Sequence, residues 1–332
     1  MIPLLLGAAA LVIGGKGVKK TVSAVSKMND AKDMAHRYER RSKRAEEKRE
    51  KAREQAGTAI GQLGETKMNI LTGSLQTFVK EFRRIKNVDF RNSVGLEELR
   101  DFRPDSPALK EIAAASQKAL EFSTGAVEGG LAGGAMALGA YGAVGALATA
   151  STGTAIAGLS GAAATNATLA WLGGGSLAAG GLGIAGGTAV LGGIVAAPAL
   201  LVAGIFLENK ADEAMDQARA YREEVREFEE RCDSNIVLMD AIRTRGDQIR
   251  SLLDTLEGHF AASLEQLQAV LRHSGTDWRK YTPEEKQQVG KAALLAKNLK
   301  IVLDTPLLRE DGTLTPESEK MLAQGLDHVS LQ

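Results

Sequence analysis

The sequence has few of the side chains from which most catalytic and metal sites are built. Among its 332 residues there is one cysteine, Cys232, which excludes an intrachain disulfide framework and a cysteine-based zinc site. Its four histidines are scattered and have no metal-ligand spacing. Aromatic residues make up 4%, too few for a base-stacking surface or a large conventional core. We therefore predict a non-enzymatic chain that binds no cofactor, metal ion or nucleic acid.

Charge is absent from a long internal tract. The 79 residues from Gly129 to Leu207 contain no Asp, Glu, Lys or Arg, and 44 of them are Gly or Ala. A helix of about 20 apolar residues can cross a hydrocarbon layer of about 30 Å, so this tract can cross more than once. We predict that residues 125–207 form a Gly/Ala-rich membrane hairpin. The alternative is a hydrophobic hairpin buried inside a soluble protein.

Small residues recur at intervals of four within this tract. Such spacing places them on one helical face and lets helices pack closely in lipid. The positions expected to pack in this way, and to support a homo-oligomer, are Gly129, Gly133, Gly153, Gly161, Gly175, Ala179, Gly183 and Gly187.

A second apolar run, Ile2–Gly15, is followed directly by Lys16, Lys19 and Lys20. We expect residues 1–20 to be an N-terminal hydrophobic anchor whose basic flank, like the charged helices, is cytoplasmic. The alternative is a short buried helix.

Residues 21–124 are predicted to be a charged helical stalk with a connector near 87–107. From Met28 to Leu63 a stripe of mostly small residues repeats at alternating steps of three and four, which is typical of a helix–helix seam. Four glycines in this stalk, at positions 57, 61, 64 and 73, are expected to loosen the helix. A helix is predicted to start at Pro107 with Ser106 as its N-cap. It is expected to return antiparallel to the long helices.

Residues 208–274 carry the longest regular apolar repeat and no proline, which predicts a coiled-coil helix. Both long helices follow apolar segments, so we expect them to run parallel from a shared membrane end. Residues 275–332 are predicted to form a small C-terminal helical unit, with helix starts after Thr282 and Thr315 and a tight turn at 310–313. The seam of the coiled-coil helix is expected to include Val225, Phe228, Cys232, Asn235, Ile242, Ile249, Leu253, Leu256 and Phe260.

Charges of opposite sign separate along the chain, although the total is balanced. Arg37–Glu54 carries nine basic and five acidic residues, whereas Asp212–Arg231 carries eight acidic and four basic residues. The basic stretch Arg37–Arg53 has three interpretations: a solvated helix face, an ion-pairing partner of the acidic stretch, or a surface for anionic lipid head groups.

Ala162–Gly187 resembles the Gly/Ala-rich segment of the small interferon-inducible glycine-rich membrane proteins, and the overall plan is similar to that of α-helical pore-forming toxins. The first resemblance implies residence in intracellular membranes and a part in antiviral or cell-death responses. We thus expect an all-α protein with long coiled-coil helices flanking a Gly-rich hydrophobic hairpin. It would be a membrane-perturbing or pore-forming effector that interacts with the lipid bilayer and with further copies of itself. The alternative is a membrane-anchored scaffold or tether that presents its stalk or C-terminal unit to a partner protein.

Overall fold

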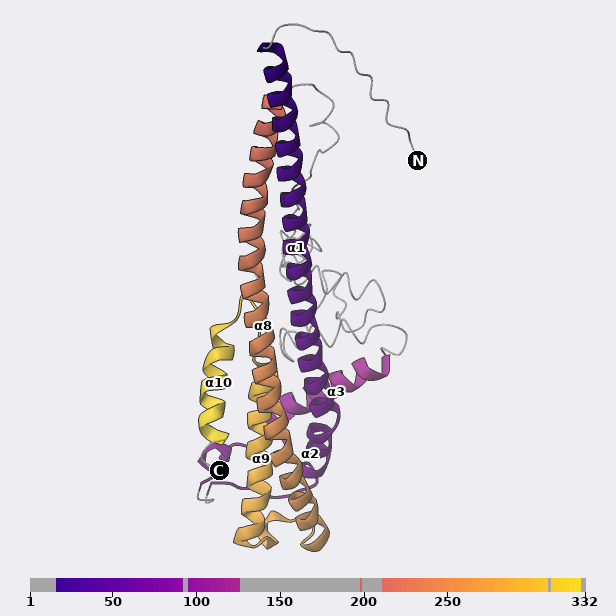
Figure 1. The fold of residues 1–332 in the computed structure, drawn as a ribbon. Helices are drawn as coiled ribbons and strands as arrows, with labels where there is room; N and C mark the ends of the chain where they lie inside the picture. Colours follow the sequence, from indigo (N-terminus) through magenta and orange to yellow (C-terminus); the bar gives the residue numbers. More distant parts are fainter. Residues whose placement is uncertain (1–15, 92–94, 126–197, 199–210, 310–311, 330–332) are drawn as a thin grey trace. The chain divides into compact units, whose positions relative to one another are not determined.

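The computed structural model describes residues 16–91, 95–125, 198, 211–309 and 312–329. Within these residues the protein is all-α, as predicted, and has no strand. Two long helices, α1 (Lys16–Thr72) and α8 (Ala211–His273), pack together (Figure 1). The shorter helices are α2 (Ser74–Phe82), η1 (Glu97–Leu99), α3 (Pro107–Gly125), η4 (Trp278–Lys280), α9 (Pro283–Asp304) and α10 (Pro316–Val329).

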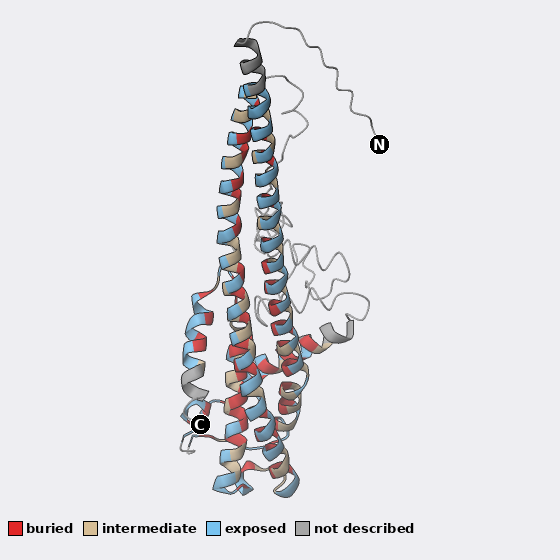
Figure 2. Ribbon diagram, in the orientation of Figure 1, coloured by how far each residue is buried: buried red, intermediate tan, exposed pale blue. Residues whose placement is uncertain are grey.

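The chain forms two compact units, and each contains a part of both long helices. Of the described residues, 16–50, 198 and 211–235 belong to the first unit, and 51–91, 95–125, 236–309 and 312–329 belong to the second. In the first unit the buried residues of α1 and α8 lie on the sides of the helices that face each other (Figure 2). In the second unit they also pack against shorter helices, as Leu252 of α8 does beside Gly325 of α10.

The two long helices run parallel within each unit, as the sequence predicted. In the first unit, Lys27 of α1 pairs with Asp212 of α8, and Arg41 pairs with Glu229 further along both helices. In the second unit, Ala59 of α1 lies next to Gly246 of α8, and Ser74, just after α1, donates a hydrogen bond of 3.0 Å to Glu257 further along. Residue numbers therefore increase together on the two sides of the contact.

The helix α1 is continuous for 57 residues, because no proline interrupts it and one side is packed along its length. Of the four glycines expected to loosen it, those at 57, 61 and 64 lie within the helix, and the fourth, Gly73, lies where the helix ends. The backbone of Gly73 approaches that of Asn69 so closely that a Cβ there would lie 2.8 Å from the Asn69 carbonyl oxygen. Only a residue without a side chain fits this break.

The second unit has a larger core than the low aromatic content predicted. Aliphatic residues from α1, α2, α3, α8, α9 and α10 form one continuous buried cluster. Its few aromatic rings form two groups. In one, Phe78 stacks on Phe82 at 5.2 Å and meets Phe260 edge-on at 5.7 Å between ring centroids. In the other, Phe90 meets Trp278 edge-on at 4.8 Å. Concentrating the rings in one unit allows a sparse set to complete a core.

The helix starts of the second unit follow the predicted capping signals. Thr282 and Glu285 form a reciprocal capping box at the start of α9. Ser106 accepts a hydrogen bond from the Leu109 amide, and Thr315 accepts one from the Ser318 amide. The predicted turn before α10 is also confirmed, because Leu308 and Leu314 form an antiparallel bridge around Gly312, whose φ is 80°.

The direction of α3 differs from the prediction. Figure 1 shows α3 crossing the second unit obliquely, rather than returning antiparallel beside the long helices. Its buried residues Leu109, Ile112, Ala115 and Ala119 follow a helical period and belong to the same core cluster. Because α3 packs mainly against the short helix α2, its direction follows that contact instead of the seam between α1 and α8.

Candidate functional site

The residues predicted for the α8 seam lie mostly in the protein interior. Seven of the nine are buried, whereas Asn235, which is polar, and Leu256 are half-buried. They are distributed over both units. The buried seven are Val225, Phe228, Cys232, Ile242, Ile249, Leu253 and Phe260.

In the first unit the seam begins with alanines. Ala31 and Ala35 of α1 are buried together with Ala214 and Ala218 of α8. Small side chains let the helices approach closely, but each buries little apolar area. This end of the helix pair therefore gains little stability from hydrophobic burial.

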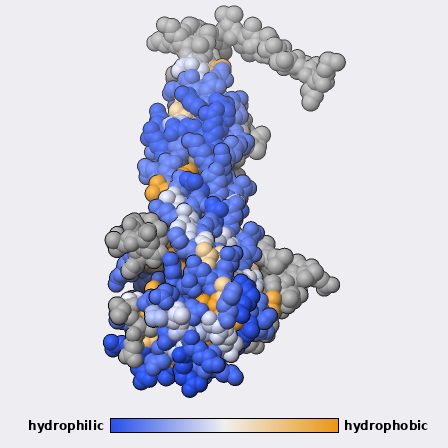
Figure 3. All heavy atoms as spheres, turned by 90° about the horizontal axis from the view of Figure 1, so that it is seen from below, coloured by the Kyte–Doolittle hydropathy of each residue, from blue (hydrophilic) through white to orange (hydrophobic). Residues whose placement is uncertain are grey.

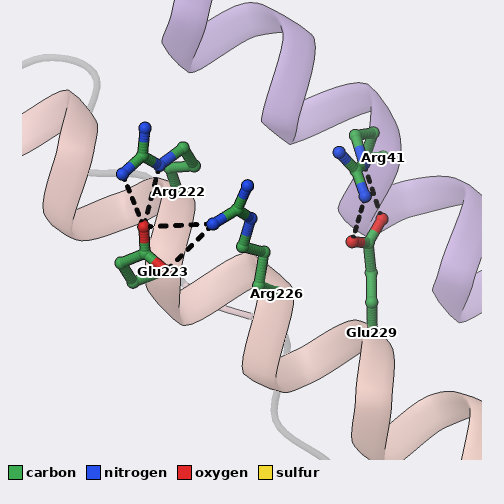
Figure 4. Close-up of polar contacts among 5 residues, drawn as sticks. All are labelled: Arg41, Arg222, Glu223, Arg226 and Glu229. Atoms are coloured by element: carbon green, nitrogen blue, oxygen red, sulfur yellow. Dashed lines mark hydrogen bonds and ion pairs between the residues drawn. The ribbon is translucent and has the colours of Figure 1, made fainter.

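Ion pairs between α1 and α8 help to fix the register of the two helices along this narrow seam. The Arg41 guanidinium donates hydrogen bonds of 2.8 and 2.6 Å to the two carboxylate oxygens of Glu229 (Figure 4). This contact raises the pKa of Arg41, and the Lys27 contact at 2.7 Å lowers the pKa of Asp212. Exposed pairs contribute only about 0–1 kcal/mol each. Their positions support a parallel register more than they support stability.

The acidic stretch of α8 also pairs within its own helix. Arg222 and Arg226 both donate hydrogen bonds to Glu223 from the same helix (Figure 4). The Arg222 hydrogen bond is the largest of the effects that lower the pKa of the Glu223 carboxyl. Much of the positive charge of this stretch is therefore paired with carboxylates of α8 itself.

The basic stretch of α1 divides between two environments. Arg41 binds Glu229 across the pair, and Arg49 packs in the seam with 9% of its surface exposed. Five other cations of this stretch are exposed, and no described carboxylate lies within ion-pairing distance of them. The fifth, Lys51, belongs to the second unit. The four that belong to the first unit, which we call the basic stripe, are Arg37, Arg40, Arg44 and Lys48.

The lone thiol is in the environment predicted from sequence. Cys232 is fully buried in the seam, and burial raises the pKa of its thiol. The thiolate, which is the nucleophilic form, is therefore disfavoured. Cys232 acts as a small apolar side chain.

A buried lysine in the second unit was not predicted from the sequence. Lys67 of α1 is 0% exposed, and its Nζ donates hydrogen bonds to the carbonyl oxygens of Leu303 at 3.2 Å and Thr305 at 3.4 Å. These carbonyls lie at the C-terminal end of α9, where the helix dipole favours a cation. Burial lowers the pKa of Lys67 to about 7, and the charge of Asp304 opposes that effect.

A signal for Lys67 was present in the repeat. The apolar stripe of the first helix passes through Leu63 and Ile70, and a step of four from Leu63 reaches Lys67. A lysine at a seam position is either an end of the seam or a buried cation with a polar partner. The partner could not be found from sequence, because it consists of backbone carbonyls at the end of α9, more than 230 residues away.

The residues predicted for membrane helix packing lie outside the described residues. The same is true of residues 1–15 of the predicted N-terminal anchor. No helix among the described residues meets the length and hydropathy needed for a membrane crossing. Figure 3 shows a face on which hydrophilic side chains predominate and hydrophobic ones are scattered. The large hydrophobic side chains exposed among the described residues are Val25, Val237 and Ile301.

No group of three or more potential metal ligands occurs in the described part of the chain. A shallow groove of the second unit is lined by Lys51, Glu54, Arg243 and Asp247, among others, and its charges balance. Comparisons with protein-family models, curated proteins and solved structures found no match for this chain.

Proposed function

We propose that this chain is a membrane-associated, non-enzymatic effector that inserts its uncharged tract into a bilayer, oligomerises there through its small-residue faces and makes the membrane leaky. The tract is residues 129–207, and the small-residue faces are those of the glycine series from Gly129 to Gly187. In this proposal the long helices form a charged coiled coil.

The observation that carries the proposal is the parallel start of α1 and α8 in the first unit. The Lys27–Asp212 pair brings the beginnings of the two helices together. In the sequence, α1 follows the apolar run 2–15 and α8 follows the uncharged tract. Both apolar segments are therefore attached to the same end of one helix pair. This arrangement suits a protein that inserts both segments into one bilayer.

The described surface also argues against folding the tract back onto the helices. Three large hydrophobic residues are exposed there, on separate parts of the chain, and isolated exposed hydrophobic residues form no docking face. The apolar sides of α1 and α8 are used against each other or in the core of the second unit. A tract of 79 uncharged residues would need a much broader apolar cover.

Purified full-length protein should release dye from loaded vesicles, with release increasing as the protein-to-lipid ratio increases. It should also remain with membranes after alkaline extraction from cells that express it. Vesicles that stay intact at every ratio would remove the pore-forming proposal.

The alternative is a membrane-anchored scaffold or tether. It is supported by the second unit, in which α9 and α10 complete a continuous core and could present a stable surface. This alternative predicts residence in membranes without leakage, and capture of a partner protein that depends on residues 208–332.

A further inference from the structure

The basic stripe lies along one face of α1 within the first unit. Its residues occupy positions i, i+3, i+7 and i+11, which share a helical face and extend over about 16 Å. All four side chains are exposed. Two exposed carboxylates, Asp33 and Glu47, are next to the stripe in the helical projection and reduce its charge without pairing to it.

The partner helix carries the opposite charge. Asp212–Arg231 of α8 has eight acidic and four basic residues, and two of these arginines are held by Glu223. One carboxylate, Glu229, pairs with Arg41 beside the stripe. The first unit thus has an unneutralised cationic stripe on α1 and an excess of acid on α8.

We propose that the basic stripe binds anionic lipid head groups and that the first unit lies along the membrane surface, with α1 towards the lipid. This inference rests on the proposed membrane function. It chooses one of two orientations, because a helix pair standing upright on the bilayer would hold the stripe away from the head groups.

Distance separates the two orientations. Arg37 is 21 residues from Lys16, the first residue of α1, which corresponds to about 32 Å along the helix. The Debye length at physiological salt is about 8 Å, so charges that far from a surface gain almost nothing from it. Only a helix lying along the membrane brings the stripe within range.

The chemistry of the stripe suits phosphate and carboxylate head groups. Guanidinium groups bind phosphate through paired hydrogen bonds, and the lysine adds a point charge. Tyr38 is the only aromatic residue between Arg37 and Lys48, and its ring is covered by Arg41. The stripe therefore lacks the stacking residues expected of a single-stranded nucleic-acid surface.

The test compares partition of the full-length protein onto phosphatidylcholine vesicles with and without phosphatidylserine. The wild-type protein should prefer the anionic vesicles, and raised salt should weaken that preference. Replacing all four stripe residues, R37Q, R40Q, R44Q and K48Q, should lower partition onto anionic vesicles roughly ten- to hundredfold. A matched variant removes four exposed, unpaired lysines of the second unit (K80Q, K110Q, K291Q and K320Q) and should keep the preference.

Equal binding of wild-type protein to both vesicle types would overturn the inference, and so would an unchanged preference in the stripe variant. If the stripe variant loses affinity for duplex DNA while vesicle binding is unchanged, the stripe serves a different ligand and the inference is also lost. Leakage is a separate readout. Equal leakage from both vesicle types in the wild type and the stripe variant would retain the proposed function while removing the inference.

Orientation can be read independently. In a C232A background, a fluorophore on E47C lies next to the stripe and about 46 Å along α1 from Lys16. Strong energy transfer to acceptor-labelled head groups is expected if α1 lies along the membrane. No transfer from vesicle-bound protein would show an upright helix and would reject the proposal.

Discussion

At the scale of single residues, Lys67 differs most from its surroundings. A lysine side chain in a protein interior pays a desolvation penalty, which hydrogen bonds to two carbonyls offset only in part. The penalty falls on the protonated form, and the pKa of Lys67 is lowered to about 7 for that reason. Its protonation state therefore affects how firmly the C-terminal end of α9 is held to α1.

The sign of the pH effect follows from the two states. Below about pH 7 both folded and unfolded chains hold the proton, and the full penalty applies. As pH rises from about 7 towards 10.5, the folded chain has released the proton but the unfolded chain still binds it. The free energy of unfolding should therefore increase over this range.

Replacing Lys67 with methionine should remove this increase, because methionine keeps much of the side-chain length and binds no proton. The free energy of unfolding of the variant should exceed that of the wild type most below pH 7, by at most a few kcal/mol. A tenfold change in proton affinity is worth about 1.4 kcal/mol. Urea unfolding of the full-length protein, followed by circular dichroism from about pH 6 to pH 10, measures how the free energy of unfolding depends on pH. K80M, which changes an exposed lysine, is the control; a K67M profile parallel to wild type would contradict the prediction.

At the scale of helices, glycines that look alike in the sequence have different roles. A Cβ at Gly61 of α1 would meet no atom within 4 Å. A Cβ at Gly246 of α8 would make ordinary contact with Ala59 at 3.8 Å. At Gly290 of α9, however, it would lie 2.1 Å from Cδ1 of Leu96, so this glycine makes room for the connector.

The prediction is opposite effects of the same substitution. Gly61→Ala should raise the free energy of unfolding by up to about 1 kcal/mol, because alanine is the better helix former. Gly290→Ala should lower it by about 1–3 kcal/mol, because the Leu96 side chain must move within a packed core. Chemical unfolding of both full-length variants measures the difference; two shifts of the same sign would contradict this account.

At the scale of the whole molecule, the proposed activity depends on assembly of the uncharged tract. Glycine adds little side-chain transfer energy, so the tract gains less from lipid than a leucine-rich helix would. Close packing between helices would have to supply the remaining stability. Assembly and membrane leakage should therefore be lost together.

Changing Gly183→Leu together with Gly187→Leu tests this dependence. The larger side chains should prevent backbone approach, reduce oligomer size in detergent and lower dye release, although they increase the hydrophobicity of the tract. Gly192→Leu with Gly193→Leu, outside the predicted face series, is the control for added bulk. Unchanged oligomer size in the first variant would count against packing through this face.

Local pattern and composition predicted much of the helical framework. The absence of proline, the alternating steps of three and four, and the capping residues Ser106, Thr282 and Thr315 specify where helices start and which sides pack. The buried seam of α8 and the inert Cys232 follow from the same periodicity. These are properties of neighbouring residues, and a sequence records them directly.

Contacts between distant segments were decided only in the tertiary structure. The sequence did not predict the oblique direction of α3, the core of the second unit or the carbonyl partners of Lys67, because each depends on residues far apart in the chain. The sequence also did not predict how the cations of the basic stretch Arg37–Arg53 divide between ion pairs and an exposed face. Which cations pair and which remain in the basic stripe depends on the rotation and register of α1 against α8. Periodicity identifies a face, but only packing decides what that face meets.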